Sequence, residues 1–401
     1  MRYPYVIVGG GLAAASAVEG IREHDREGAI LMLSRDNHLP YNRPPLSKGL
    51  WFGKDTLDSL PVHPAEYYHD HKCEVLLRRE AVELDPQAKK VWDDRGVEYE
   101  YGKLLLATGG HPRMLDAPGA TIAGVHYYRY LEDYLQLQSD LPRIQHVLVV
   151  GGGFIGVEMA AALTHAGKEV TMIYPEEYPL RRVLPREIGL HVADYYREKG
   201  IEVISGESVA SFEEQGTEIV ARTHSGNHAR TQLALVGAGL VPHTDLADAA
   251  GLEVSNGILV DEFTRTSNED VFACGDVAEF PYLALQRSTR VEHWDHAIFH
   301  GRTAGANMAG ARKPYEHLPM FYSDHFDLGW EAVGDVDSSL TVEAVWRERF
   351  KEGVIFYLRD DVVRGALMWN AWGLVDWARD LIRAAKPMTV EERAKAIPAA
   401  G

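Results

Sequence analysis

The chain is poor in cysteine, which excludes one large class of redox site. Only two of its 401 residues are cysteines, Cys73 and Cys274, and they lie far apart. They form neither the closely spaced pair of a thiol–disulfide site nor a metal-binding spacing. We interpret both as ordinary thiols of a reducing compartment, and we predict no metal site.

Long apolar runs and an excess of positive charge are also missing. No apolar run has the length needed to span a membrane, so no membrane insertion is expected. A predicted strand and glycine turn begin within ten residues of Met1, which argues against a signal peptide and for a cytoplasmic protein. Lysine and arginine number 41 against 59 aspartates and glutamates, and this balance argues against binding of nucleic acid.

The chain does contain the dinucleotide-binding fingerprint, and it contains it twice. In the first copy an apolar strand enters a turn at Gly9, Gly11 allows the backbone to approach a pyrophosphate, and small Ala14 permits close packing of helix on strand. The matching residues of the second copy are Gly151, Gly153 and Gly156. Two copies imply two nucleotide cofactors, held so that electrons pass between them.

The strand after each fingerprint is expected to end near a carboxylate that binds the adenosine ribose. In the second copy this carboxylate is Glu176, which favours NADH because it repels the 2′-phosphate of NADPH. Arg181 and Arg182 follow it and weaken that preference, since their side chains are able to reach a phosphate. In the first copy Asp36 takes the role, displaced by one position.

Two further motifs indicate that one of the two nucleotides is a flavin and the other a nicotinamide. An apolar strand ends in Ala107, Thr108 and Gly109, and a second ends in Gly275 and Asp276. The Asp276 carboxylate is suited to accept hydrogen bonds from sugar hydroxyls. Either motif alone is weak evidence, but the two motifs in this order, together with both fingerprints, are specific for a flavin and a nicotinamide site.

The pattern of predicted elements indicates a nucleotide domain inserted into another, followed by a small closing domain. We expect residues 73–106 to form a small antiparallel sheet, an apolar helix near residues 372–385 to pack on a C-terminal sheet, and a capping box at Thr389. The predicted domains are residues 1–116 and 244–317 for the first cofactor, 117–243 for the second, and 318–401 for the closing domain.

With these motifs the chain resembles the FAD-dependent pyridine nucleotide oxidoreductases, in their ferredoxin-reductase branch and most of all the apoptosis-inducing factors. The resemblance runs from residue 5 to about residue 337. It rests on residues 40–52, 107–110, 151–158, 291–297 and 321–324. It implies an α/β fold with two Rossmann-like dinucleotide-binding domains of the glutathione-reductase type and a small C-terminal α+β domain.

The resemblance also implies the residues of both cofactor sites. The FAD site takes Gly9, Gly11, Ala14, Asp36, Arg43, Lys48, Val82, Ala107, Thr108, Gly109, Gly275, Asp276, Glu292, His293, Trp294 and Tyr322. The NAD(H) site takes Gly151, Gly153, Phe154, Ile155, Gly156, Glu158, Glu176 and Gly239.

By the same resemblance, Lys48 lies beside the flavin ring and pairs with Glu158. Such an ammonium can support the charge that develops when a flavin is reduced. Glu292, His293 and Trp294 complete the catalytic set, since they resemble the segment that packs against the flavin and nicotinamide rings. Phe154 resembles the side chain that shields the flavin where the nicotinamide enters.

The chain departs from the resembling sequences at several points. Tyr322 stands where the branch usually has tryptophan, and Arg35 stands where a ribose-binding glutamate is usual. The closing domain is too short for the long insertion of the animal death factors, and no mitochondrial targeting segment is evident. We therefore expect the chain to share the redox core of the resembling proteins and not their apoptotic role.

These observations predict an FAD-dependent oxidoreductase that takes hydride from NADH, with NADPH less favoured. Without a cysteine pair, electrons must leave the flavin to a separate acceptor: a ferredoxin or rubredoxin, or alternatively a quinone. Ferredoxins are usually acidic, and the arginines available to meet one are Arg287, Arg290, Arg302 and Arg312. The alternative is a slow redox sensor that forms a charge-transfer complex with NADH and dimerises. We expect a monomer or a homodimer.

Overall fold

The computed structural model describes residues 1–398, and these fall into two compact units assembled from separate stretches of chain. Unit 1 comprises residues 1–42, 58–111 and 241–319, and unit 2 comprises residues 43–57, 112–240 and 320 onward. The three-domain division expected from sequence stays a prediction. Its inserted second domain and its closing domain fall together in unit 2, and so does the short segment 43–57.

Unit 1 is built on a seven-stranded sheet with the order β3-β2-β1-β6-β5-β4, in which β18 also pairs with β6. Its strands are β1 (Arg2–Val8), β2 (Ile30–Ser34), β3 (Cys73–Leu77), β4 (Ala81–Asp85), β5 (Lys90–Asp93), β6 (Glu98–Leu106) and β18 (Val271–Ala273). The expectation of an antiparallel sheet over residues 73–106 holds for β4, β5 and β6. It is wrong for β3, which pairs parallel with β2 because helix α2 (Ala65–Asp70) returns the chain in the same direction.

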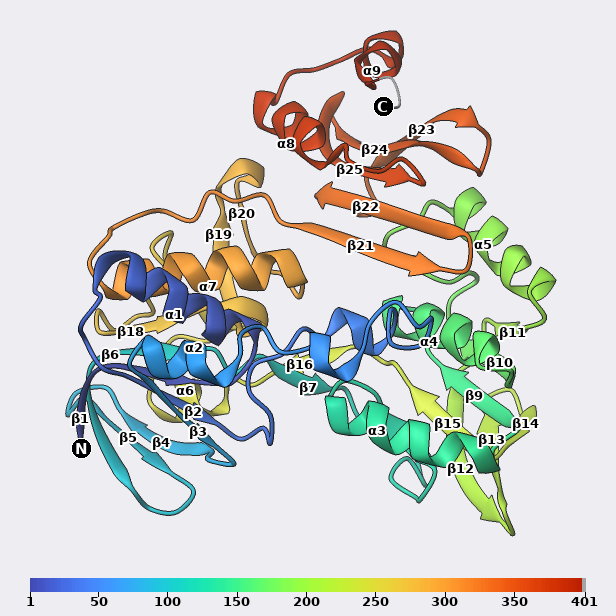
Figure 1. The fold of residues 1–401 in the computed structure, drawn as a ribbon. Helices are drawn as coiled ribbons and strands as arrows, with labels where there is room; N and C mark the ends of the chain where they lie inside the picture. Colours follow the sequence, from blue (N-terminus) through green and yellow to red (C-terminus); the bar gives the residue numbers. More distant parts are fainter. Residues whose placement is uncertain (399–401) are drawn as a thin grey trace. The chain divides into compact units, whose positions relative to one another are not determined.

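The helices of unit 1 are α1 (Leu12–His24), α2, α6 (Asp245–Ala249) and α7 (Trp294–Met308). Figure 1 shows α1 and α7 side by side. Their backbones nearly touch, because a Cβ added to Gly20 would lie 2.0 Å from the Arg302 carbonyl oxygen, and one added to Gly305 would lie 2.0 Å from that of Ala17. The two helices are therefore in close backbone contact.

A small sheet completes unit 1, formed by β17 (Ile258–Leu259), β19 (Ala278–Tyr282) and β20 (Arg287–Arg290). Five short 3-10 turns occur along the described chain: residues 44–46, 57–59, 141–143, 275–277 and 283–285. Strands β7 (Gly110–Pro112) and β16 (Leu240–Pro242) pair with each other where the chain passes between the units.

Unit 2 contains a parallel five-stranded sheet with the order β11-β10-β9-β15-β8. The strands are β8 (Val125–Tyr127), β9 (His146–Val150), β10 (Glu169–Tyr174), β11 (Glu202–Ser205) and β15 (Leu233–Val236). Its helices are α3 (Leu131–Asp140), α4 (Phe154–His165) and α5 (Arg186–Glu198), and an antiparallel sheet is formed by β12 (Val209–Gln215), β13 (Glu218–Thr223) and β14 (His228–Thr231).

An antiparallel C-terminal sheet belongs to the same unit, with the order β21-β22-β25-β24-β23. Its strands are β21 (Met320–His325), β22 (Leu328–Gly334), β23 (Thr341–Glu348), β24 (Glu352–Arg359) and β25 (Val362–Trp369). Strand β21 packs against α4, and the Tyr357 hydroxyl of β24 donates to the Val183 carbonyl at 2.8 Å. The C-terminal sheet is therefore anchored on α4 and on the segment that precedes α5.

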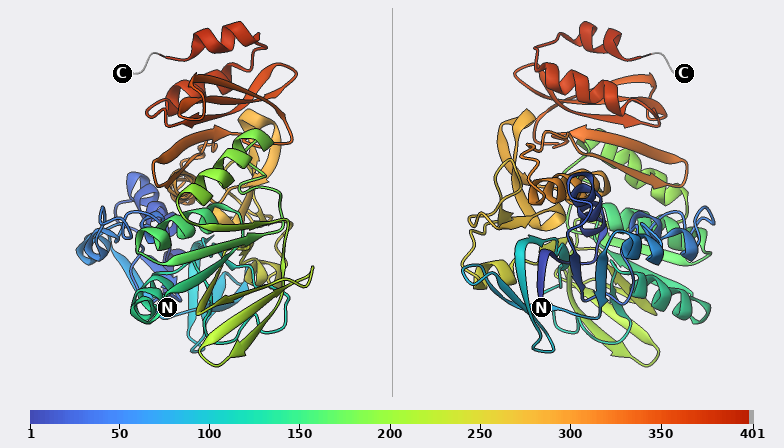
Figure 2. Two further views of the ribbon diagram at one scale, coloured as in Figure 1. Left: turned by 90° about the vertical axis from the view of Figure 1, so that its right-hand side faces the viewer. Right: turned by 60° about the vertical axis from the view of Figure 1, so that its left-hand side comes forward.

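Helix α8 (Val375–Ala384) packs on the C-terminal sheet through buried Ala378 and Ile382, as expected, and Figure 2 shows it across one face. Helix α9 (Val390–Ala396) begins with the predicted capping box. The Glu392 carboxylate accepts from the Thr389 backbone at 2.7 Å. The predicted fold class is thus confirmed. Among residues 1–398 no helix is both long enough and apolar enough to cross a membrane.

Candidate functional site

The two fingerprint turns have nearly the same backbone geometry. Gly9 has φ +127° and Gly151 has φ +118°, a region that favours glycine. A Cβ at Gly9 would lie 2.2 Å from the Ala107 carbonyl oxygen, and a Cβ at Gly151 would lie 2.4 Å from that of Gly237. Only glycine fits at either turn.

Each turn leads directly into the N-terminus of a helix. Helix α1 follows Gly11 and α4 follows Gly153, and neither helix has a side-chain N-cap. Uncapped backbone N–H groups at a helix start attract a phosphate. Position 14 is a fully buried alanine, and a Cβ at Gly156 would lie 1.9 Å from the Gly151 carbonyl oxygen. Both turns therefore leave room for a pyrophosphate beside a helix N-terminus.

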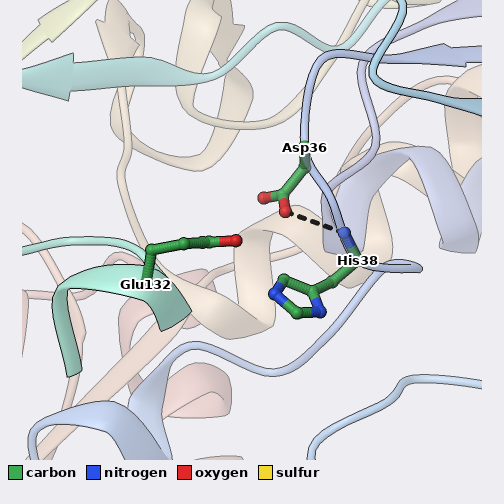
Figure 3. Close-up of side chains that lie close together, drawn as sticks. All are labelled: Asp36, His38 and Glu132. Carbon is green, nitrogen blue, oxygen red and sulfur yellow. Dashed lines mark hydrogen bonds between the residues drawn. The ribbon is translucent and has the colours of Figure 1, made fainter. Parts of the chain in front are cut away.

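The carboxylates expected at the adenosine ends follow the second strand of each half. In unit 1, Asp36 Oδ1 accepts from the His38 backbone at 3.1 Å (Figure 3), so the turn after β2 is ordered around it. Neighbouring Arg35 lies 2.7 Å from His243 Nε2. In unit 2, half-buried Glu176 follows β10, and its carbonyl accepts from the Gly206 backbone at 2.9 Å.

The two strand-end motifs meet at one edge of the unit 1 sheet. Strands β1, β6 and β18 are parallel neighbours, so Gly9, Ala107 and Gly275 lie at the same carboxyl edge. Thr108 Oγ1 donates to the His243 carbonyl at 2.9 Å, while Asp276 presents its carbonyl to Arg290 at 2.9 Å. The predicted FAD-site residues of these motifs are therefore close together. Gly109 and Gly275 both have positive φ, +62° and +72°.

The segment Glu292–Trp294 also belongs to unit 1 and leads into α7. His293 is its N-cap residue, and burial lowers the pKa of this histidine to about 4. The Trp294 indole is 41% exposed and donates to Asn42 Oδ1 at 2.8 Å. Glu292 lies 2.6 Å from Arg290. The indole is thus held by a hydrogen bond while much of the residue stays exposed.

Other predicted residues are more scattered. Val82 is exposed on the edge strand β4. Ile155 lies in the first turn of α4, and Gly239 has φ +100° just before β16. Arg43 lies 5.6 Å from the centre of the Tyr130 ring. The structure gives Val82 no polar contact that marks it as a site residue, and its role stays a prediction.

The predicted Lys48–Glu158 pair is present within unit 2. Lys48 Nζ lies 2.7 Å from Glu158 Oε1, and Glu158 is only 2% exposed. The segment before Lys48 is fixed by two donors to the Leu46 carbonyl, Trp51 Nε1 at 2.6 Å and the Tyr128 hydroxyl at 2.5 Å. A buried carboxylate is stable only when paired, so the lysine is held at the buried face of α4.

Aromatic side chains surround this ion pair. Lys48 Nζ lies 5.2 Å from the centre of the Tyr322 ring, and burial raises the pKa of that phenol to about 12. Phe154, at the start of α4, packs edge-on against Phe321 with ring centres 5.4 Å apart. Unit 2 therefore brings Tyr322 to the Lys48 ammonium, while Phe154 packs on the neighbouring residue of β21.

The sequence prediction missed two serines that contact the ion pair. Ser47 Oγ donates to Glu158 Oε2 at 2.6 Å, and Ser323 Oγ donates to Glu158 Oε1 at 2.7 Å. It also missed His325, a buried residue whose two ring nitrogens have no hydrogen-bond partner among the described residues. The only available signal was the period of two along β21, which places Ser323 and His325 on one face.

The two cysteines take no part in this chemistry. Both are buried and neither forms a disulfide. Burial raises the pKa of the Cys73 thiol to about 12, and it also raises that of Cys274. The thiolate is the reactive form, so both are inert at neutral pH.

Two models of known protein families match this chain. Residues 3–301 match the family model described as pyridine nucleotide-disulphide oxidoreductase. Residues 304–352 and 347–384 match the C-terminal domain of mitochondrion-associated apoptosis-inducing factor.

Among curated proteins, rhodocoxin reductase of Rhodococcus erythropolis is 32% identical over 82% of this chain and 77% of its own length. Apoptosis-inducing factor 1 of Dictyostelium discoideum is 31% identical over 98% of this chain and 80% of its own. A crystal structure of the ferredoxin reductase for the CYP199A2 system from Rhodopseudomonas palustris superposes with a TM-score of 0.91, at 30% identity, over 96% of both chains.

Proposed function

Because this chain belongs to the pyridine nucleotide-disulphide oxidoreductase family and is an NAD(P)H-dependent FAD oxidoreductase, we propose that it oxidises NADH and passes the electrons to a small ferredoxin- or rubredoxin-type carrier. The observation that carries this proposal is the buried Lys48–Glu158 pair in unit 2, close to the second fingerprint turn. The similarity to two proteins named as reductases of such electron-transfer systems supports the choice of acceptor.

FAD is assigned to the first turn and NADH to the second. The FAD residues of unit 1 meet at the carboxyl edge of β1, β6 and β18, where glycines leave room for a pyrophosphate. Bound there, FAD supplies the conversion of one two-electron donation into single-electron deliveries. In unit 2, Glu176 favours NADH because its carboxylate repels a 2′-phosphate.

The residues around Lys48 prepare a site for charge that develops during reduction. Glu158 holds the Lys48 ammonium at a fixed position, and a preorganised cation stabilises developing negative charge without further reorganisation. The Tyr322 ring excludes water near this cation, which strengthens its field. Trp294 offers a flat ring for stacking in unit 1.

The absence of a reactive thiol among the described residues favours direct transfer to a separate acceptor. For an acidic carrier, two of the four candidate arginines are already engaged: Arg290 pairs with Glu292, and Arg302 pairs with Glu23. We therefore place less weight on these two as a docking patch. A quinone acceptor is the alternative, and we propose a cytoplasmic location.

Anaerobic stopped-flow absorbance tests the proposal. Mixed with NADH, the FAD-loaded protein should bleach at 450 nm within seconds, and NADPH should act more slowly. The reduced protein should then reoxidise on a ferredoxin or rubredoxin faster than on a quinone. Failure of NADH to reduce the flavin would refute the proposal.

A slow NADH sensor is the second candidate, favoured by the match of residues 304–384 to the C-terminal domain of apoptosis-inducing factor. It predicts slow reduction, a persistent long-wavelength absorbance band and NADH-dependent dimerisation. Light scattering with and without NADH, together with the absorbance record, separates it from the reductase.

A further inference from the structure

The Glu158 carboxylate is bound by three donors from two different segments of unit 2. Oε1 receives Lys48 Nζ and Ser323 Oγ, each at 2.7 Å, and Oε2 receives Ser47 Oγ at 2.6 Å. Ser323 is fully buried, Ser47 is 4% exposed and Glu158 is 2% exposed. Both carboxylate oxygens are thus satisfied away from solvent.

We propose that Ser47 and Ser323 are positioning residues that keep Glu158 ionised and fixed, and so hold the Lys48 ammonium in its working orientation. This inference rests on the proposed function, because it gives the serines a role only through Lys48. Neither serine is assigned contact with substrate or cofactor.

Charge and burial explain why Lys48 alone is not sufficient to keep the buried Glu158 carboxylate ionised. Hydrogen bonds to an ionised carboxylate favour the charged form, and a buried carboxylate oxygen without one strongly disfavours it. Among residues 1–398, Ser47 Oγ is the only hydrogen-bond donor to Oε2. Without Ser47, protonation of Glu158 would remove both the buried charge and the attraction that holds Lys48.

The chain neighbours of the two serines strengthen the geometric argument. Ser47 directly precedes Lys48, so this segment grips the same carboxylate twice. Ser323 directly follows Tyr322, whose ring lies under the Lys48 ammonium. The two serines therefore link the two partners of Lys48, which are the Glu158 carboxylate and the Tyr322 ring, through neighbouring positions of the chain.

Other titratable groups on the described neighbouring elements face this cluster. None of them supplies a positive charge in place of the Lys48 ammonium. Burial lowers the pKa of His325 to about 3, so it stays neutral at pH 7. Tyr322 and Tyr196, on β21 and α5, have raised pKa values because of burial and stay protonated. Burial also raises the pKa of Asp324, which the infrared control below distinguishes from Glu158.

The test uses the full-length, FAD-loaded protein with Ser47→Ala, Ser323→Ala and the double variant. Ser338→Ala is the matched control, since its hydroxyl bonds the Arg181 carbonyl elsewhere in unit 2. Ser47→Thr keeps the hydroxyl and should restore wild-type behaviour. If the double variant does not fold, the two single variants and Ser47→Thr still decide the question.

The first readout is independent of turnover. In pH-difference infrared spectra without NADH, the double variant should gain the carbonyl stretch of a protonated carboxylic acid as the pH falls from 8 to 6. That band should be missing in the wild type and in Ser338→Ala, and adding Glu158→Gln should abolish it. A band that survives Glu158→Gln, or no band at all, overturns the proposal.

The second readout is the pH profile of flavin reduction by NADH. At pH 6 the limiting rate of the double variant should fall about tenfold below that of the wild type, and the difference should shrink at higher pH, with little change in apparent NADH affinity. Identical profiles for the double variant and Ser338→Ala overturn the proposal. If the wild type itself is not reduced, the proposed function fails, while the infrared result still tests the serines.

Discussion

The two dinucleotide halves share a turn but differ in what their helices bury. The Gly9 and Gly151 turns have similar φ angles and equally close backbone neighbours. Helix α1 buries small and apolar side chains with Ser16 as its one polar exception, and it lies in backbone contact with α7. Helix α4 buries Glu158 and reaches Lys48 through it.

This difference separates the part of each half that binds a nucleotide from the part that takes part in the reaction. The turn and the helix start bind a pyrophosphate in both halves, and their geometry does not reveal which cofactor reacts there. The buried face of the helix decides that: α1 offers a rigid, apolar support for a resident cofactor, and α4 offers an anchored cation. Substitutions on matched positions should therefore have unequal effects.

The largest difference is expected at the glycine turns. Gly9→Ala places a Cβ against the Ala107 carbonyl at a positive φ, which costs at least about 2 kcal/mol and should abolish FAD binding. Gly151→Ala should keep bound FAD but abolish reduction by NADH. Flavin absorbance after gel filtration, followed by stopped-flow mixing, checks both. If Gly151→Ala loses FAD instead, that result would contradict the assignment of FAD to the first turn and NADH to the second.

Substitution of the buried polar residue of each helix should have the next largest effect. Glu158→Gln removes the charge that holds Lys48, so flavin reduction by NADH should slow by about tenfold to a hundredfold. Ser16→Ala on α1 should leave this rate unchanged, because no hydrogen bond joins Ser16 to a charged side chain within residues 1–398. Circular dichroism serves as the control that both variants fold. Equal rates for the two variants would contradict the assigned role of α4.

The two units should also differ in acid sensitivity. Burial lowers the pKa of His293 to about 4 and of His300 to about 3 in unit 1, and that of His325 to about 3 in unit 2. The unfolded chain binds these protons near pH 6.5, so stability is complete above that pH and is lost as the pH falls toward the folded values.

Each such histidine should cost about 2 kcal/mol of folding free energy between pH 7 and pH 5. Hydrogen exchange followed by mass spectrometry at the two pH values should show larger loss of protection in unit 1. His325→Gln should reduce the loss in unit 2 only. Uniform loss over both units would argue against this account of the buried histidines.

The smallest effect concerns nucleotide choice. Glu176→Ala removes the carboxylate expected to repel a 2′-phosphate, so the preference for NADH over NADPH should fall several-fold, by about 1 kcal/mol. Asp36→Ala on the first half is the matched control and should leave the preference unchanged. Apparent affinities from the concentration dependence of flavin reduction give the comparison.

Much of the fold and site was predictable because it depends on residue type at fixed spacing. Glycines at the turns follow from the positive φ and the close backbone approach that each fingerprint needs. The approach of Lys48 to Glu158 was implied by the resemblance of the chain to a known family. Strand direction was not predictable from alternation: residues 73–77 alternate as an edge strand would, yet α2 makes them parallel to β2.

The serine contacts were also beyond prediction from sequence. Ser47 and Ser323 lie 276 positions apart, and a hydroxyl has no spacing rule that joins it to a distant carboxylate. The same is true of Arg302, which was a candidate for a docking patch until the structure paired it with Glu23. Such pairings depend on packing between elements distant in sequence.

The most direct test of the central claim is anaerobic reduction by NADH of Lys48→Ala beside Lys54→Ala, an exposed lysine of the same segment. Lys48→Ala should retain FAD and be reduced at least about tenfold more slowly, while Lys54→Ala should match the wild type. Equal rates for the wild type and both variants would contradict the assignment of the chemistry to the Lys48–Glu158 pair.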